Sequence, residues 1–376
     1  MRRRTRLRGV PALVLALALA LSAAAIAVAL PTLAHAPPAG AQTPPAGTQS
    51  PPAGAQSPPA GTQSAPAGTP GEAATQPSPL AVGIGEQHPW MFGDARFRAL
   101  GIRYARISVS WDVLAHAKQR NTLFAWLRGA HLDGVAPLVA FERSWIPGHF
   151  RRLPSAAQLA GAVRSLRARY PWLTDFATWN EANYCGQPTC HHPGLVAAYY
   201  TRLRAACPSC HILGAELLDV PGMVEWVARE RRAIGHEPEI WGLHNYIGAN
   251  RLSAASTKAL LAATHGQIWF TETGGVVARH GHHPDGFPET PAHAAKVTRF
   301  VFQRLVPLSP QIKRVYLYQW GAGTGRREPW DSGLLDAHDK PRPAFWVLVQ
   351  ELHKLGQLPV TPAATALLAK AAHAGA

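Results

Sequence analysis

Residues 174–181 read TDFATWNE, and this stretch ends an apolar run with an amide and a carboxylate, Asn180 and Glu181. The same pattern returns at 267–272, QIWFTE, which ends in Glu272. Short runs rich in β-branched and aromatic residues predict buried β-strands. Packing alone does not require such strands to end in acids, so the pattern bears on both the fold and the site.

Further segments of this kind occur between about Leu80 and Leu358, separated by longer helical patterns. The predicted strands are 80–85, 103–109, 136–141, 174–179, 212–217, 239–244, 267–272 and 314–320. The predicted helices include Ala156–Arg169, Gly194–Ala206, Met223–Ala233, Ser253–His265, Pro291–Leu305 and Pro341–Leu355. Eight strand–helix units in about 280 residues predict an α/β fold, a single (β/α)8 barrel of the TIM type over 80–358.

A doubly wound open sheet is the competing α/β architecture. Such sheets usually carry a glycine-rich phosphate-binding turn after the first strand. Here the first predicted strand leads into 86–90, EQHPW, which contains no glycine. The barrel is therefore favoured.

The N-terminal residues 1–36 have the layout of a secretory signal. Arginines between Arg2 and Arg8 precede an uncharged run, Leu13 to Leu30, and 34–36 (AHA) is a small-residue cleavage pattern. An uncleaved membrane anchor is the alternative, because about 18 apolar residues nearly cross a bilayer. Either way, we expect a secreted or cell-envelope-associated, extracytoplasmic protein.

Two further segments lie outside the predicted barrel. Residues 37–64 repeat a seven-residue unit such as PPAGAQT or PPAGTQS, and a degenerate copy, APAGTPG, follows. The composition of 37–79 is typical of a disordered, flexible linker that holds a domain away from a membrane or spans a cell wall. Residues 359–376 form an Ala-rich C-terminal tail, for which we expect an appended or frayed helix without a site.

The chain of 376 residues is basic, with 37 Lys and Arg against 22 Asp and Glu and a net charge of +15. A basic surface suits association with an anionic cell wall or envelope. The predicted barrel has no basic run interleaved with aromatic residues, so no nucleic-acid partner is expected. We expect a monomer.

Four cysteines lie close together, at Cys185, Cys190, Cys207 and Cys210. An even number in an exported chain predicts two disulfides, and the sequence leaves their pairing open. A structural zinc site involving the neighbouring His191 and His192 is the alternative, although the spacing is not a strong zinc signature. Neither a metal nor a cofactor is expected.

Active residues of a barrel gather at the C-terminal ends of its strands. Glu181 and Glu272 each end an apolar strand, three strand–helix units apart, so they are expected to face each other across the barrel mouth. Glycoside hydrolysis needs two such carboxyl groups, one to protonate the leaving oxygen and one to attack or to activate water. We expect a raised pKa for Glu181 and a charged Glu272.

Other residues at the strand ends suit supporting roles. His244 and Tyr246 share the same parity, and the Tyr246 hydroxyl is expected to bind Glu272 and keep it ionised. Arg106 is expected to point into the barrel, where it needs an anionic partner such as Glu272. The remaining candidates for contact with a sugar are Asn180, Trp320, Trp111, Trp145, Trp179, His88 and Glu142.

This set of residues resembles clan A of the glycoside hydrolases. The resemblance is carried by Asn180-Glu181, Glu272 in WFTETGG, the His244 and Tyr246 pair, Arg106 and Trp320. Within the clan the sequence is most similar to family 39 and related β-xylosidase-type enzymes. The resemblance implies retaining chemistry, with Glu181 as the general acid/base and Glu272 as the nucleophile. The cysteine-bearing loop after Glu181 departs from the clan's pattern.

The sequence therefore predicts an exported retaining O-glycosyl hydrolase that acts on a poly- or oligosaccharide. Two alternatives remain open. One is a non-catalytic carbohydrate-binding barrel tethered to the cell envelope. The other is a metal-dependent hydrolase that uses histidines such as those in 279–283, RHGHH.

Overall fold

The computed structural model describes residues 80–279, 286–322 and 330–374. The predicted signal (1–36), the predicted linker (37–79) and the histidines of 280–283 lie outside these ranges. Among the described residues, no helix has both the length and the apolarity needed to cross a membrane.

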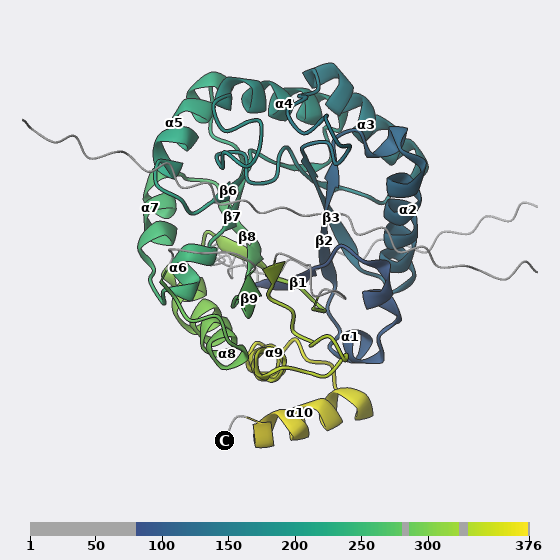
Figure 1. The fold of residues 1–376 in the computed structure, drawn as a ribbon, viewed down its shortest axis with the longest axis vertical. Helices are drawn as coiled ribbons and strands as arrows, with labels where there is room; N and C mark the ends of the chain where they lie inside the picture. Colours follow the sequence, from purple (N-terminus) through teal and green to yellow (C-terminus); the bar gives the residue numbers. More distant parts are fainter. Residues whose placement is uncertain (1–79, 280–285, 323–329, 375–376) are drawn as a thin grey trace, which may run out of the picture. The chain divides into compact units, whose positions relative to one another are not determined.

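The core is a parallel sheet whose strands follow the order β5-β4-β3-β2-β1-β10-β8-β7-β6. Figure 1 shows the strands at the centre of a ring of helices. The strands are β1 (Ala81–Gly85), β2 (Tyr104–Ser110), β3 (Ala136–Glu142), β4 (Asp175–Ala177), β5 (His211–Leu213), β6 (Glu216–Leu218), β7 (Ile240–His244), β8 (Gln267–Thr273) and β10 (Ile312–Tyr318).

The predicted fifth strand is divided between β5 and β6, which flank Gly214 and Ala215. β5 pairs with β4, and β6 pairs with β7. The backbone nitrogen of Gly214 donates to Ile240 O (2.9 Å), and that of Glu216 donates to Trp179 O (3.0 Å). β5 and β6 are therefore two halves of one barrel strand, and the sheet closes almost completely. The predicted (β/α)8 barrel is confirmed.

Glycine is required at this interruption because the backbone passes close to a neighbouring segment. A Cβ at Gly214 would lie 2.9 Å from the ring of Pro238 and 3.2 Å from the indole of Trp241. The pattern of apolar residues does not reveal such a close approach, so the sequence predicted one continuous strand.

Helices cover the outside of the barrel (Figure 1). They are α1 (Ala95–Ala99), α2 (Ala117–Leu132), α3 (Ala156–Arg169), α4 (Pro193–Ala206), α5 (Met223–Ile234), α6 (Tyr246–Asn250), α7 (Ala255–Ala263), α8 (Pro291–Phe300), α9 (Pro343–Lys354) and α10 (Pro362–Ala374). Short elements are η1 (Pro89–Gly93), η2 (Val113–Ala115), η3 (Val301–Leu305, a π-helix), η4 (Val306–Leu308), and the paired strands β9 (Ala278–Arg279) and β11 (Trp330–Asp331).

A local sequence signal explains where α3 begins, and a side-chain contact holds α10 in place. α3 begins with a reciprocal capping box between Ser155 and Gln158, which satisfies two otherwise unpaired N–H groups. α10 lies within the predicted tail and packs on α9, where the Gln350 amide donates to Ala371 O (2.8 Å).

A charged cluster lies near the N-terminal ends of the strands, beside a buried group of apolar side chains that includes Leu138, Leu213 and Ile240. The Arg314 guanidinium lies 3.6 Å from the centre of the Trp269 ring and 4.4 Å from that of Tyr104. It donates to Asp175 (2.5 Å), which also lies 2.9 Å from the His211 imidazole. The cluster joins β4, β5 and β10 inside the barrel.

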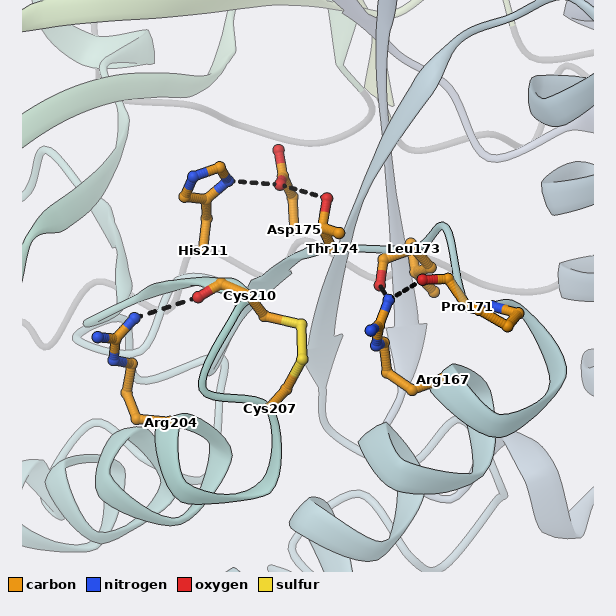
Figure 2. Close-up of a disulfide and its surroundings, with 9 residues drawn as sticks. All are labelled: Arg167, Pro171, Leu173, Thr174, Asp175, Arg204, Cys207, Cys210 and His211. Carbon is orange, nitrogen blue, oxygen red and sulfur yellow. Dashed lines mark hydrogen bonds and ion pairs between the residues drawn. A yellow bond between two sulfur atoms is a disulfide. The ribbon is translucent and has the colours of Figure 1, made fainter. Parts of the chain in front are cut away.

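The disulfide Cys207–Cys210 closes the turn between α4 and β5, next to this cluster (Figure 2). Its Cα atoms are 5.3 Å apart, within the usual range. Arg204 donates to Cys210 O (3.1 Å) across the same turn, and Arg167 binds the carbonyl groups of Pro171 and Leu173 on the neighbouring turn. The second disulfide joins Cys185 to Cys190, with Cα atoms 4.9 Å apart.

Candidate active site

A pocket opens at the C-terminal ends of the strands. Its volume is about 600 Å³, open solvent at the mouth included. It is lined by Gln87, Ser108, Glu142, Arg143, Asn180, Glu181, Tyr184, Gly186, Gln187, Tyr246, Glu272, Tyr318 and Trp330. The lining brings together both glutamates at the ends of the predicted strands, which lie far apart in sequence.

Glu181 follows β4 in a left-handed backbone conformation, with φ of 47°. This region is unfavourable for residues other than glycine. Hydrogen bonds on both sides hold the segment: Asn180 N donates to Phe141 O (2.7 Å), and Ala182 N donates to Glu216 O (2.9 Å). The main chain therefore fixes the glutamate at the pocket.

The Glu181 side chain is 10% exposed. Burial raises its pKa to about 7, together with the nearby negative charge of Glu216, while the positive charges of Arg106 and Arg143 act in the opposite direction. Near neutral pH a substantial fraction of the group is protonated, as general-acid chemistry requires.

Glu272 lies on β8 and carries the two hydrogen bonds that the sequence predicted. Arg106 Nη1 donates to Oε1 (2.5 Å), and the Tyr246 hydroxyl donates to Oε2 (3.1 Å). Burial nevertheless raises the pKa of Glu272 above its ordinary value, and the charges of His244 and Arg106 only partly counter this effect. The pKa of Glu272 is therefore raised even with these partners in place, which is opposite to the direction expected for a carboxyl group kept ionised.

The two carboxyl groups share one neighbour. His244 Nδ1 lies 3.2 Å from Glu181 Oε1 and 3.8 Å from Glu272 Oε2. These two oxygens are therefore at most about 7 Å apart, the sum of the two distances. Carboxyl groups about 5–5.5 Å apart are typical of retaining glycosidases, and groups about 6.5–9.5 Å apart of inverting ones. The bound includes the retaining separation and the shortest inverting separations.

Arg106 lies beneath the pocket and is fully buried. Besides Glu272 it binds Glu216 through two hydrogen bonds (2.7 and 2.5 Å) and Asn180 Oδ1 (2.7 Å). Glu216 was missed in the sequence analysis. Its signal is a single acid within the apolar run 212–218, ILGAELL, just as Arg106 is a single cation within ARISV.

Aromatic residues also line the pocket, but none of the tryptophans expected from the sequence is among them. Trp330 of β11 lines the pocket and packs edge-on against Tyr246, with ring centres 4.8 Å apart. Trp320, which was predicted to contact a sugar, is not among the lining residues. β10 ends at Tyr318, so strand alternation does not extend to Trp320, which is fully buried between Phe97 and Phe345.

Three further tryptophans that were expected to contact a sugar do not line the pocket either. Trp179 is fully buried and stacks on Tyr199, and Trp145 donates its indole N–H to Glu142 (2.9 Å). Trp111 lies in a separate shallow groove beside α3, with its indole N–H on Arg152 O (3.2 Å). Each of these rings is engaged by the protein itself.

The two remaining predicted polar contacts differ in outcome. His88 is not among the lining residues; its imidazole lies 2.8 Å from Glu86, with half of the side chain exposed. Glu142 does line the pocket and is buried. Burial raises its pKa, while hydrogen bonds from Gln187 and Trp145 act to lower it.

The loop after Glu181 contributes Tyr184, Gly186 and Gln187 to the pocket and is closed by the Cys185–Cys190 disulfide. Cys185, Cys190 and His191 offer donor atoms within 4.8 Å of one another. Both sulfur atoms are bonded to each other, so they are not available as the thiolate ligands that zinc requires.

Comparisons with solved structures identify glycoside hydrolases of clan A as similar folds. Xylanase 10B from Thermotoga petrophila, solved with xylobiose, gives a TM-score of 0.53 at 12% identity over 73% of this chain and 94% of its own. The family 53 catalytic domain from Ignisphaera aggregans gives 0.55 at 14% identity over 73% and 97%. A family 39 enzyme from Bacteroides cellulosilyticus gives 0.48 at 18% identity, and the match spans only 63% of that chain.

At these identities the likeness concerns the fold alone. No protein-family model matches the sequence. No curated protein sequence matches it either. The chain thus has the (β/α)8 fold of clan A glycoside hydrolases, without placement in a particular family.

Proposed function

We propose that this protein is a retaining glycoside hydrolase that cleaves O-glycosidic bonds in a poly- or oligosaccharide. The observation that carries the proposal is the arrangement of Glu181 and Glu272, two buried carboxyl groups that flank His244 Nδ1 in one pocket. The xylanases and related enzymes with similar folds support a carbohydrate substrate.

In the first step, protonated Glu181 gives its proton to the glycosidic oxygen while Glu272 attacks the anomeric carbon. The bond to the leaving group breaks, and a glycosyl ester forms on Glu272. In the second step, ionised Glu181 takes a proton from water, the water oxygen attacks the anomeric carbon, and the ester bond breaks. Glu181 is protonated again and Glu272 is released as a carboxylate.

The surrounding groups assist each role. Arg106 and Tyr246 donate to Glu272 and stabilise its charged form. Asn180 accepts from Arg106 through Oδ1, so its amide nitrogen is left to face the pocket and donate to a sugar hydroxyl. Burial keeps Glu181 protonated to about pH 7.

The test is hydrolysis of a panel of aryl β-glycosides, xylan and other polysaccharides by the wild type, Glu181→Ala, Glu272→Ala and the control Glu225→Ala. Glu225 is an exposed acid on α5. We expect both pocket variants to lose at least about three orders of magnitude in kcat, with Glu225→Ala unchanged. Full activity in Glu272→Ala would refute the assignment.

Azide distinguishes the two roles, because a small anion can occupy the space left by a removed carboxylate. With Glu181→Ala and an activated aryl substrate, azide should give a glycosyl azide of retained configuration. With Glu272→Ala it should give the inverted one. Glycan binding without hydrolysis by the wild type would instead support a non-catalytic carbohydrate-binding barrel.

We also propose that the protein is exported and acts at the cell envelope as a monomer, tethered or spaced by residues 37–79. The signal-like residues 1–36 and the basic composition support this proposal. The test is to locate the full-length chain by cell fractionation, and to ask whether removal of 1–36 retains it in the cytoplasm.

A further inference from the structure

The pocket contains a third carboxyl group that the proposed reaction does not use. Glu142, at the end of β3, is buried and accepts hydrogen bonds on both oxygens. Trp145 Nε1 donates to Oε1 (2.9 Å), as does Ser108 Oγ (3.3 Å), and Gln187 Nε2 donates to Oε2 (3.0 Å). Three separate donors therefore fix this carboxyl group beside the acid.

The orientation of the Gln187 amide is set by its neighbours. Its oxygen accepts from Trp179 Nε1 (3.2 Å) and from the backbone nitrogen of Arg143 (3.2 Å). Because both of these groups only donate, the amide oxygen must face them and the NH₂ group must face Glu142. Gln187 thus joins the ends of β3 and β4 to the carboxyl group in the pocket.

The loop that carries Gln187 is a closed unit. The Cys185–Cys190 disulfide spans it, Thr189 Oγ1 donates to Ala182 O (3.0 Å), and Trp226 Nε1 donates to Cys190 O (3.0 Å). Arg143 also donates to Gly186 O (2.8 Å). The loop is therefore held at both ends and in its middle.

We propose that the 184–190 loop is a specificity wall, in which Gln187 positions Glu142 to accept a hydrogen bond from a hydroxyl group of a neutral sugar. The proposal rests on the glycosidase function proposed above and identifies the substrate at this subsite. Gln187 acts through Glu142 and is a positioning residue, whereas Glu142 contacts the sugar.

The charges of the pocket favour a neutral sugar over an acidic one. Among the described lining residues, Glu142, Glu181 and Glu272 provide three carboxyl groups, and Arg143 provides the one guanidinium. A uronic acid at this subsite would add another carboxylate to a buried, acid-rich environment, which is unfavourable. A sugar hydroxyl group instead donates to the acceptor position that Glu142 retains on Oε2, which accepts only from Gln187 among the described residues.

The first test compares Gln187→Ala with the control Gln311→Ala. Gln311 also uses its amide to bind loop carbonyls, those of Thr264 (3.3 Å) and Gly266 (3.1 Å), but it lies outside the pocket. We expect Gln187→Ala to raise KM for a neutral oligosaccharide about tenfold with kcat within about threefold, and Gln311→Ala to change neither. If Gln187→Ala instead lowered kcat by about the same factor and left KM unchanged, the proposal would be overturned.

The second test exchanges the two groups. Gln187→Glu combined with Glu142→Gln keeps the hydrogen bond between the two positions with donor and acceptor reversed, and the new carboxylate can still accept from Trp179 and Arg143. Support of the fold is thereby restored, but the carboxylate is moved. We expect the melting temperature of the double variant to match that of the wild type, whereas its KM stays above the wild-type value. Recovery of KM would show that Glu142 serves only packing and would overturn the proposal.

The third test opens the loop. The variant Cys185→Ser/Cys190→Ser removes the disulfide of the pocket loop. The control Cys207→Ser/Cys210→Ser removes the other disulfide, which does not line the pocket. We expect the first pair alone to raise KM. The sugar affinity of each variant is also measured by calorimetry in a Glu272→Gln background. These affinities test the wall even if no hydrolysis is found, and an unchanged affinity in every loop variant would contradict it.

Discussion

At the scale of single residues, the chemistry depends on how burial and hydrogen bonding divide the two glutamates. Both have raised pKa values because both are buried, but their partners differ. Glu272 accepts from Arg106 and Tyr246, whereas the hydrogen-bond neighbour of Glu181 within the described residues is the imidazole of His244. Burial also lowers the pKa of His244, although the negative charges of Glu272 and Glu216 act in the opposite direction.

The raised pKa of Glu181 has a measurable effect on stability. Its folded value is about 7, above its ordinary 4.5, so the folded state binds the proton more tightly than the unfolded state. Stability is therefore lost as the pH rises from about 4.5 to about 7. Glu181→Gln removes this loss and should be about 3 kcal/mol more stable than the wild type at pH 8, but not at pH 4. Denaturant unfolding at both pH values measures the difference; equal stability at pH 8 would contradict the assignment.

Arg106 is predicted to matter for both stability and reaction. Arg106→Met leaves Glu216 and Glu272 buried without their cation, which should cost about 3–5 kcal/mol in the free energy of unfolding. The pKa of Glu272 should rise further, so the acid limb of the kcat/KM profile should move to higher pH. Adding Glu216→Gln should recover part of the stability but not the activity. Recovered activity in the double variant would mean that Arg106 acts only through Glu216.

Residue-level errors in the sequence analysis have physical causes. The expected place of Trp320 in the pocket extends strand alternation beyond Tyr318, where the strand in fact ends. Trp330 reaches the pocket from β11, a strand of two residues that is too short for an apolar run to predict it. Glu216 was detectable, because a lone acid in an apolar strand needs a buried partner and Arg106 is the matching lone cation.

At the scale of elements, the short helix α6 connects the proposed nucleophile to a neighbouring strand. Asp219, just after β6, accepts from the backbone nitrogens of Ile247 (3.0 Å) and Gly248 (2.6 Å) in its first turn. Asn250 at the other end donates to Gly274 O (2.9 Å), just beyond β8. The helix is thus held at both ends, and Tyr246 in its first turn is brought to Glu272.

Asp219→Asn should therefore affect catalysis through Tyr246. We expect it to destabilise the protein by about 1–2 kcal/mol, as loss of a helix cap does. Loss of the Tyr246 hydrogen bond raises the pKa of Glu272, so Tyr246→Phe should move the acid limb of the kcat/KM profile to higher pH. Asp219→Asn should move it in the same direction by a smaller amount. In the double variant the kinetic effect should not exceed that of Tyr246→Phe alone. Additive kinetic effects would show that Asp219 does not act through Tyr246.

Element positions were largely predictable from sequence because barrel strands are short apolar runs between amphipathic helices. The predicted strand 136–141 corresponds to β3 (Ala136–Glu142), and the predicted helix Ala156–Arg169 has the observed bounds of α3. The division of the fifth strand at Gly214 and Ala215 was not predictable, because the apolar pattern runs through both positions. The disulfide pairing also required the fold.

At the scale of the whole barrel, the pocket and the charged cluster of Arg314, Asp175 and His211 lie at opposite ends of the strands. The C-terminal ends hold the pocket, and the N-terminal ends hold the cluster. Burial acts to raise the pKa of Asp175, but hydrogen bonds from His211 and Arg314 outweigh it and the pKa is lowered. Asp175 therefore stabilises the fold above its ordinary pKa, and this contribution is lost as the pH falls through the lowered value.

Asp175→Asn tests whether the charged cluster at the N-terminal ends of the strands affects the pocket at their C-terminal ends. Removing the charge leaves Arg314 largely buried without its carboxylate partner and should cost about 3–5 kcal/mol in the free energy of unfolding at pH 7. Below the melting transition, kcat and KM should match the wild type, in contrast to Arg106→Met. A changed KM in fully folded Asp175→Asn would show that the lower cluster influences the pocket.

The central claim, that Glu272 forms a covalent bond to the sugar, is tested most directly by trapping that bond. A 2-deoxy-2-fluoro glycoside with a good leaving group, of the sugar found in the activity screen, slows hydrolysis of the glycosyl ester so that it accumulates. Peptide mass spectrometry should then find the added sugar mass on Glu272, and no label in Glu272→Gln. A label on another residue, or unlabelled wild type with a product of inverted configuration, would contradict the account.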